Sequence, residues 1–519
     1  MEATTFTKQG LGIVESTALG YDQKIRALAG LAVSALPYPA LSPACAAALE
    51  DRVICDMFEG NRPVSPRYVL PDYRKALHNG LTYLELDPPQ DLDEALMFLT
   101  VLYGHVPSVT TYPVYVGHLD SLLEPYVPED MSDDELDARL RRFWIMMDRL
   151  CPDGFTHANV GPRDGRVIRS IWRVERALRQ TVPNLTLCVD PDVTPDDLLL
   201  DAVETTFVTA KPHYVNHPMM VEDHGGPDYG VVSCYNALNV GGGSHTLVRV
   251  NLQKAAERHE GDLESFLADA LPHWVELTCE LGEARIRSLV EDSGFFKSHF
   301  LVTEGLVSLD RFGAMFGIFG LAECVNTFME REGRAEARYG LDDGANLASY
   351  RITERIAELV AARPVAYCEG FHGRMYMHSQ SGIDLDLDAT AGTRIPVGEE
   401  PGVREHIAAV APHHRLFPSG ISDIFAIEET VTRNPQAMVD IIKGALGYGM
   451  RDFTWNLDNN EFIRITGYLV RKSDIASFED HGGARHSSDL LAGTAERNHS
   501  VLTRRVKVVE ANPLVTAPA

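Results

Sequence analysis

A glycine lies within a run of strand-forming residues toward the carboxyl-terminal end of the chain. Residues 462–470 read Phe-Ile-Arg-Ile-Thr-Gly-Tyr-Leu-Val, and Gly467 has no turn-forming residue on either side. Glycine weakens a strand, so within one it usually marks a β-bulge or a place where another backbone approaches closely. Because glycine has no Cβ, a distant segment can pack directly against its α-carbon. The run therefore predicts either a bulged strand or a fold that brings another part of the chain onto Gly467.

A cysteine lies at the end of a second apolar strand. Residues 229–234 read Tyr-Gly-Val-Val-Ser-Cys, and three consecutive glycines at 241–243 precede the next strand-like run. An isolated cysteine is typically a small buried apolar residue, but functional groups of α/β folds lie at strand ends. The apolar neighbours Val232 and Leu238 predict a raised thiol pKa, and so a neutral S–H group at Cys234.

Helix signals recur along the chain. Ser132 and Glu135 form a capping-box pattern that predicts a helix to about residue 150. A proline followed by two acidic residues at 195–197 predicts another over 198–208. A third is expected after Pro435, ending near the glycines at 444–449.

Strand-like runs lie between these helices, at 230–233, 246–252 and 462–470. Alternating strands and helices predict an α/β fold. The loop-rich stretch 382–401 is the best candidate for a domain boundary, but its length is more typical of an active-site loop. Residues 512–519 are expected to form a disordered tail.

The chain is strongly acidic. Its 519 residues contain 47 Lys and Arg against 74 Asp and Glu, a net charge of −27. Such a surface repels phosphate backbones, so we expect no nucleic-acid partner. The apolar run 25–36 is too short to span a membrane. We therefore expect a cytoplasmic protein with no membrane attachment.

The eight cysteines are scattered, and none forms a Cys-x-x-Cys pair. This spacing predicts neither a zinc knuckle nor a disulfide framework, but reduced thiols in the cytoplasm. The cysteines are Cys45, Cys55, Cys151, Cys188, Cys234, Cys279, Cys324 and Cys368.

Two motifs resemble those of glycyl radical enzymes. Arg464-Ile465-Thr466-Gly467-Tyr468 is similar to their glycine loop. Residues 234–238, Cys-Tyr-Asn-Ala-Leu, and 247–252 resemble the cysteine-loop region of the YjjI family and, more distantly, that of anaerobic ribonucleotide reductases. The likeness to the YjjI family extends over nearly the whole chain, through residues 53–60, 67–73, 105–110, 316–323, 411–414 and 419–424.

The resemblance implies a ten-stranded α/β barrel of two five-stranded half-barrels wrapped by helices. The cysteine loop and the glycine loop would meet inside it. Residues 1–430 would form the catalytic barrel with the cysteine loop, and residues 431–519 the glycyl radical region packed into the same barrel.

The resemblance also implies a radical function that is sensitive to oxygen. Gly467 would store a radical on its α-carbon and Cys234 would become the transient thiyl that attacks the substrate. A separate radical S-adenosylmethionine enzyme would install the radical, since no cysteine spacing here suits an iron–sulfur cluster. We expect no other cofactor, no metal, and a homodimer.

Departures from the known subclasses leave the reaction open. Asn236 stands where glycyl radical dehydratases typically have a glutamate base, and asparagine cannot accept a proton at neutral pH. Cys234 has no cysteine neighbour of the pyruvate formate-lyase kind, and the zinc cysteines of anaerobic ribonucleotide reductases are missing. We expect C–O elimination or rearrangement of a small hydroxylated substrate. The alternatives are a reductase similar to anaerobic ribonucleotide reductase, and a non-catalytic partner that supplies its glycine loop to repair another enzyme.

Polar residues in expected loops are candidates for substrate binding. The pattern His213-x-x-x-His217 has prolines at both edges, which predicts a loop rather than a metal-binding helix. The glycines at 241–243 before Ser244 are equally typical of a tight turn between strands. The candidates are Asn236, His213, His217, His378, His413, His414 and Ser244.

Overall fold

Two sheets form the centre of the molecule. The computed structural model describes residues 3–17, 19–57, 61–106, 115–151, 156–379, 389–464, 467–483 and 485–486. The first sheet has the order β1-β9-β10-β11, and β2 also pairs with β9. Its strands are β1 (Ile54–Cys55), β2 (Tyr68–Leu70), β9 (Gly242–Asn251), β10 (Phe312–Phe319) and β11 (Met375–His378).

The second sheet has the order β12-β13-β6-β5-β4-β3. Its strands are β3 (Tyr115–His118), β4 (His157–Val160), β5 (Asn184–Val189), β6 (His213–Asn216), β12 (Asp423–Ile427) and β13 (Asp452–Leu457). Strands β3 to β6 are mutually parallel, and β13 runs antiparallel to β6. The predicted α/β fold is confirmed, with five and six strands in the two sheets of the described chain.

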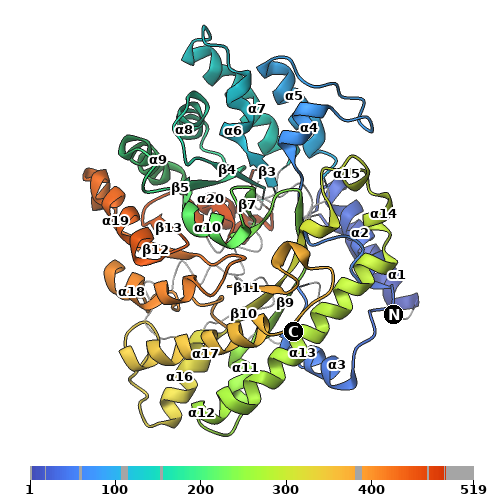
Figure 1. Cartoon of the computed structure of the whole chain (residues 1–519), viewed down its shortest axis with the longest axis vertical. Helices are drawn as coiled ribbons and strands as arrows, with labels where there is room; N and C mark the ends of the chain where they lie inside the picture. The colour runs from blue at the N-terminus through green and yellow to red at the C-terminus, as the bar shows by residue number, and fades with distance from the viewer. Residues whose placement is uncertain are drawn as a thin grey trace.

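Helices cover the outer faces of both sheets (Figure 1). Helices α11 (Leu252–Glu257), α13 (Leu271–Arg287) and α17 (Asp343–Ala361) pack against the first sheet, and α6 (Leu119–Leu123) and α19 (Pro435–Tyr448) against the second. Every residue of β5 and of β10 is buried. A sheet covered on both faces explains the apolar composition of β10, Phe-Gly-Ala-Met-Phe-Gly-Ile-Phe.

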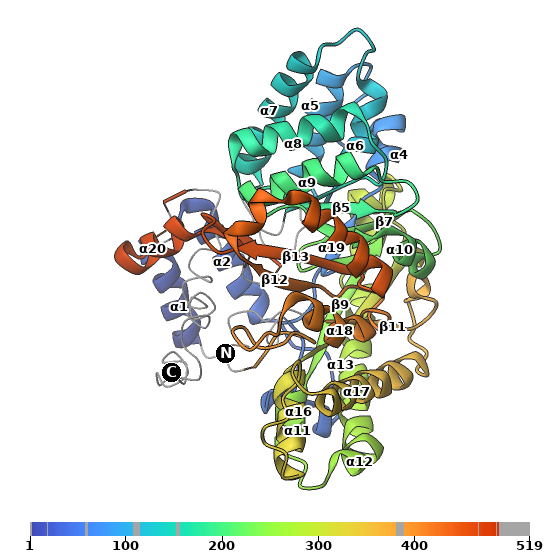
Figure 2. The ribbon, with the colours of Figure 1, turned by 90° about the vertical axis from the view of Figure 1, so that its left-hand side faces the viewer.

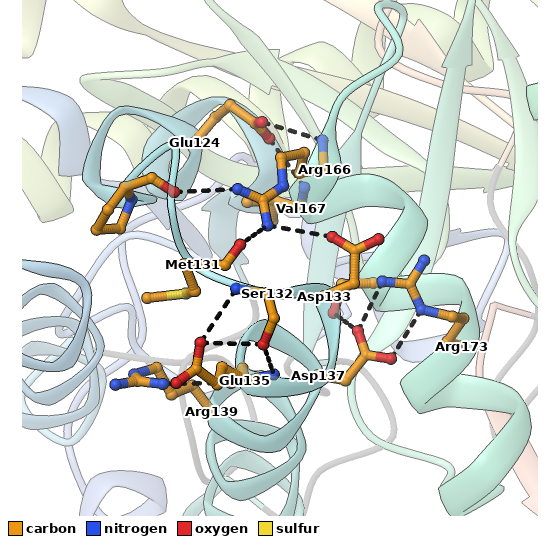
Figure 3. A network of polar contacts seen from close by, with 12 residues as sticks. Glu124, Met131, Ser132, Asp133, Glu135, Asp137, Arg139, Arg166, Val167 and Arg173 are labelled. Carbon is orange, nitrogen blue, oxygen red and sulfur yellow. Dashed lines mark hydrogen bonds and ion pairs between the residues drawn. The ribbon is translucent and has the colours of Figure 1, made fainter.

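The outer helices of the second sheet are joined by polar contacts at their ends (Figure 3). The predicted capping box is confirmed, because Ser132 and Glu135 exchange side-chain and backbone hydrogen bonds at the start of α7 (Asp133–Leu150). Glu124 accepts hydrogen bonds from the backbone N–H groups of Arg166 and Val167 at the start of α8 (Arg166–Leu178). These contacts fix the layer that backs strands β3 to β5. The predicted second helix is also present, as α9 (Asp196–Thr209), which packs against α8 and α19.

A β-hairpin carries Cys234 into the space between the sheets. Strands β7 (Tyr229–Val232) and β8 (Asn236–Asn239) are antiparallel, and Cys234 lies in their turn. Asn159 of β4 holds the backbone of Val231, and the N–H of Ala237 donates to the carbonyl of Ser419 just before β12. In Figure 1, β7 lies centrally, between the two groups of helices.

The predicted single strand over 462–470 is wrong. The chain reverses there into a second hairpin, β14 (Phe462–Arg464) and β15 (Leu469–Arg471), in which Arg464 pairs with Leu469. Gly467 therefore lies in the connecting loop, although no other turn-forming residue flanks it. Helix α20 (Lys472–His481) follows and lies at the edge of the molecule in Figure 2.

The predicted loop around His213 and His217 is also wrong. His213 lies in β6, and α10 (His217–His224) begins directly after it. Asn216 caps this helix through the N–H of Met219, and Pro218 occupies its first turn, where proline is tolerated. The proline thus starts a helix that it was expected to prevent.

The predicted active-site loop and carboxyl-terminal tail fall wholly or partly outside the described residues. The stretch 382–401 is described only from residue 389, and the tail 512–519 lies outside the described residues. No helix within the described ranges is long and apolar enough to cross a membrane.

Candidate active site

Gly467 and Cys234 are in direct contact inside the molecule. A Cβ atom placed on Gly467 would lie 2.8 Å from both Cβ and Sγ of Cys234, and closer still to its Cα. Real Cβ atoms essentially never approach other atoms so closely, so only glycine fits this position. The cysteine is 4% exposed and Gly467 is buried.

The turn around Cys234 is conformationally strained. Ser233 and Tyr235, on either side of it, have φ values of 56° and 62°, in the left-handed region. Non-glycine residues there cost about 1–3 kcal/mol each and cluster at functional sites. Gly420 supports the turn, because its α-carbon packs tightly against the carbonyl oxygen of Tyr235.

The Cys234 thiol is neutral at physiological pH. Burial raises its pKa to about 11, although Ser233, the guanidinium groups of Arg67 and Arg394 and the N–H of Gly467 each act to lower it. Val232 and Leu238 lie in the same buried cluster as Cys234. The predicted raised pKa is confirmed.

The glycine loop is held by amide side chains. Asn184, at the start of β5, donates a hydrogen bond of 3.0 Å to the carbonyl oxygen of Gly467. Asn456 of β13 forms two hydrogen bonds with the backbone of Arg464, at 2.9 Å each. Both ends of the loop are thereby fixed to the second sheet.

A row of buried polar side chains crosses the second sheet beneath the cysteine turn. Thr186 lies 2.7 Å from Nε2 of His157 and 2.8 Å from Nε2 of His213, and Nδ1 of His213 lies 3.1 Å from Asp452 Oδ1. The ring of His213 meets that of Tyr235 edge-on, at 4.7 Å between centroids. Burial lowers the pKa of both histidines and raises that of Asp452, each by a wide margin, so neutral histidines and a protonated Asp452 are favoured in this row.

Three of the predicted substrate-binding residues lie around the cysteine turn. Asn236 donates from Nδ2 to the carbonyl of Val232, while its buried Oδ1 has no hydrogen-bond partner among the described residues. His213 belongs to the polar row. His378 ends β11 and contacts the carbonyl of Ser419 through Nδ1, and that ring nitrogen also lies against Gly420.

The other four lie elsewhere. His217 contacts the hydroxyl of Tyr229 and lines a separate cavity of about 650 Å³ at the carboxyl ends of β3 to β6. His413 is hydrogen-bonded to Ser349 and Thr353, both on helix α17. The remaining two are part of the framework, since His414 contacts Asp423 and the hydroxyl of Ser244 donates to Thr246.

The structure adds residues that carry no sequence signal. Asn184, His157, Thr186 and Asp452 stand on three different strands, and Arg394 follows β11 in a loop. None belongs to a motif. The pairing of the strands brings the first four together, and Arg394 joins them from its loop through the carbonyl of Ser422. Among the described residues no group of His, Cys, Asp or Glu is arranged to hold a metal ion.

Solved structures define the class of fold. The chain aligns with the hydroxyproline dehydratase of Clostridioides difficile at a TM-score of 0.67 and 12% identity, over 89% of this chain and 86% of that one. It aligns with the glycerol-bound B12-independent glycerol dehydratase of Clostridium butyricum at 0.66 and 13%, over 90% and 86%. For the anaerobic ribonucleotide reductase of Thermotoga maritima the values are 0.63 and 12%, over 92% and 89%. The protein has the fold of the glycyl radical enzymes.

Sequence comparison places the chain within that class. The family described as "Glycyl radical enzyme YjjI-like" matches residues 19–507. The uncharacterized protein YjjI of Escherichia coli (strain K12) is 47% identical over 96% of this chain and 95% of its own length. A protein of Haemophilus influenzae (strain ATCC 51907 / DSM 11121 / KW20 / Rd) is 37% identical over 88% and 89%. The chain belongs to the YjjI-like family of glycyl radical enzymes.

Proposed function

We propose that Gly467 stores the radical of this enzyme and that Cys234 transfers it to the substrate. The contact between these two residues carries the proposal, since 233 positions of sequence separate them and only glycine fits against the cysteine. The neutral thiol supports it further, because transfer of a hydrogen atom requires the S–H form. A radical S-adenosylmethionine enzyme would act as the activating partner.

The proposed cycle consists of hydrogen-atom transfers between the sulfur of Cys234, the α-carbon of Gly467 and a carbon of the substrate. Cys234 gives its sulfur-bound hydrogen atom to the α-carbon of Gly467, so that an S–H bond breaks and a C–H bond forms. The sulfur then takes a hydrogen atom from a substrate C–H bond. After the substrate has rearranged or lost water, Cys234 returns a hydrogen atom to the product and recovers one from Gly467. The fold positions these groups and excludes water while the radical performs the chemistry.

The proposed substrate is small and hydroxylated, and the proposed reaction is C–O elimination or rearrangement. Asn236 Oδ1 is a buried acceptor that has no donor within the described structure, so it could accept a hydrogen bond from a substrate hydroxyl group. Relatives in fold act on such compounds, as the solved hydroxyproline and glycerol dehydratases do. The base that elimination needs is supplied in this proposal by the neutral imidazole of His157 or His213, while protonated Asp452 orients the ring of His213.

Reduction of a nucleotide is the second candidate, and the match to anaerobic ribonucleotide reductase over 92% of the chain favours it. That reaction consumes an external reductant, whereas elimination does not. Turnover by the activated enzyme without added reductant therefore separates the two. We further propose a homodimer that works in the absence of oxygen.

Electron paramagnetic resonance tests the radical assignment. After anaerobic activation, the wild type and Cys234→Ser should show an organic radical signal, and Gly467→Ala should show none. Only the wild type should turn over substrate. A signal that persists in Gly467→Ala would place the radical on another residue.

A further inference from the structure

Arg394, near the proposed radical site, forms no ion pair with any residue that the structure describes. Its Nε donates a hydrogen bond of 3.1 Å to the carbonyl of Ser422, while its Nη2 is buried and has no partner among the described residues. Arg394 takes part in none of the ion pairs among the described residues. No carboxylate of those residues therefore lies within 4.0 Å of its guanidinium group.

The segment that holds Arg394, residues 419–422, lies against the hairpin that carries Cys234. Ser419 accepts from the N–H of Ala237, Gly420 packs against the carbonyl of Tyr235, and Ser422 holds Arg394. These contacts hold Arg394 next to the cysteine hairpin, and its charge acts to lower the pKa of the Cys234 thiol. The charge of Arg67, which is also positive, acts on the pKa of this thiol in the same direction.

The two buried carboxylates of this region are engaged elsewhere. Asp423 contacts His414 at 3.0 Å and lies 3.6 Å from His406, and Asp452 is bonded to His213. Asp452 lies near enough to feel the charge of Arg394, but burial raises the pKa of Asp452 well above its usual range and favours its neutral form, and neither carboxylate forms an ion pair with Arg394. Arg394 is half-buried, but its enclosed Nη2 has no partner among the described residues, and an unsatisfied charged donor favours an anion brought from solution.

We propose that the substrate carries an oxyanion group, a carboxylate or a phosphate ester, which Arg394 binds beside Cys234. This inference rests on the proposed function of the site. The planar guanidinium group matches both kinds of oxyanion with two parallel hydrogen bonds. Together with the acceptor at Asn236 Oδ1, it selects a hydroxy acid or a hydroxylated phosphate ester over a neutral polyol.

Binding to the protein before activation tests this inference without any radical. Isothermal titration and thermal melting would be measured with acetate and inorganic phosphate, then with glycerate and glycerol 3-phosphate. Glycerol and an equal ionic strength of chloride serve as ligand controls. We expect the oxyanions to bind the wild type with millimolar or tighter affinity and to raise its melting temperature, as mass action requires. Whether the carboxylate or the phosphate of each pair binds more tightly identifies the group.

The variants separate a specific site from a general effect of salt. Arg394→Gln should weaken oxyanion binding at least tenfold, Arg394→Lys should weaken it less, and the exposed Arg404→Gln should leave it unchanged. Equal binding by wild type and Arg394→Gln would overturn the inference, as would glycerol binding as tightly as the anions or no oxyanion binding at all. Because the radical signal is measured separately, its absence would sink the proposed function and not this binding site.

Discussion

The side-chain amide of Asn184 donates a hydrogen bond of 3.0 Å to the carbonyl oxygen of Gly467. Its own Oδ1 accepts from the N–H of Leu185, so the amide is fixed in orientation. Asn184, the first residue of β5, thereby ties the glycine loop to the second sheet at Gly467, the residue that contacts Cys234.

Asn184→Ala should loosen the glycine loop. The substitution leaves a buried carbonyl without its donor, which costs about 1–3 kcal/mol. We expect faster amide exchange in residues 462–471 and a shorter lifetime of the stored radical, with little change elsewhere. Asn326→Ala, on helix α16 (Leu321–Arg331), is the matched control. Unchanged exchange in the loop would show that Asn184 does not hold it.

Ser233→Gly should stabilise the protein relative to Ser233→Ala. Both remove the hydroxyl, so their difference reports the left-handed backbone at this position, where φ is 56°. Alanine there costs about 1–2 kcal/mol more than glycine. Thermal melting of the two variants measures the difference, and an alanine variant as stable as the glycine variant would contradict a strained turn.

Alkylation of Cys234 should become fast only in strong alkali. With a pKa of about 11, the reactive thiolate increases about tenfold per pH unit from pH 7 to pH 10 without a plateau. Peptide mapping after timed treatment with iodoacetamide checks this. Arg394→Gln should slow the reaction further, because it removes a cation that lowers this pKa, while Arg404→Gln should not. A plateau below pH 9 would mean a thiolate, which cannot donate a hydrogen atom.

Asp120→Asn should stabilise the protein increasingly as the pH rises. Burial raises the pKa of Asp120 to about 7, and the residue as a whole is 8% exposed. A raised carboxyl pKa favours the protonated folded state, so the wild type loses stability as the pH rises from about 4 through 7. The melting temperature of Asp120→Asn minus that of wild type should grow from pH 5 to pH 8. The exposed Asp269→Asn should show no such trend, and a flat difference for Asp120→Asn would refute the burial effect.

Air should cut the activated chain at Gly467. A radical on an α-carbon reacts with dioxygen, and the backbone breaks there, leaving a fragment that ends at Ala519. Mass spectrometry of air-treated protein locates the cut. Cys234→Ser should be cut in the same way, whereas Gly467→Ala and protein that was never activated should remain whole.

The sequence predicted the fold class and the two residues that meet, but not the path that the chain takes to join them. Local patterns determine the capping box at Ser132 and the burial around Val232, and both were predicted correctly. The reversal between Arg464 and Leu469 was missed because its one turn-forming residue, Gly467, stands alone in a strand-forming run and was interpreted as a bulge or a close backbone approach. Asn456 of β13 forms hydrogen bonds with the backbone of Arg464 where the reversal begins, which is a contact that strand propensity does not record.

The rest of the site depends on strand register. Asn184, Thr186 and Asp452 are ordinary polar residues in sequence, and they gather only because β5, β6 and β13 are neighbours. His413 and His414 were predicted from their position in an expected loop. They lie instead on helix α18 (Val403–His414), where each bonds to the protein framework.

The relay between Cys234 and Gly467 is tested most directly by solvent isotope exchange into the glycyl radical. In H₂O the hydrogen on the Gly467 α-carbon should split the paramagnetic resonance signal into a doublet. In D₂O the thiol of Cys234 becomes deuterated and passes deuterium to that carbon, so the wild-type doublet should collapse to a narrow single line. Cys234→Ala should keep its doublet in D₂O. A wild-type doublet that persists in D₂O, or a collapse in Cys234→Ala, would contradict the relay.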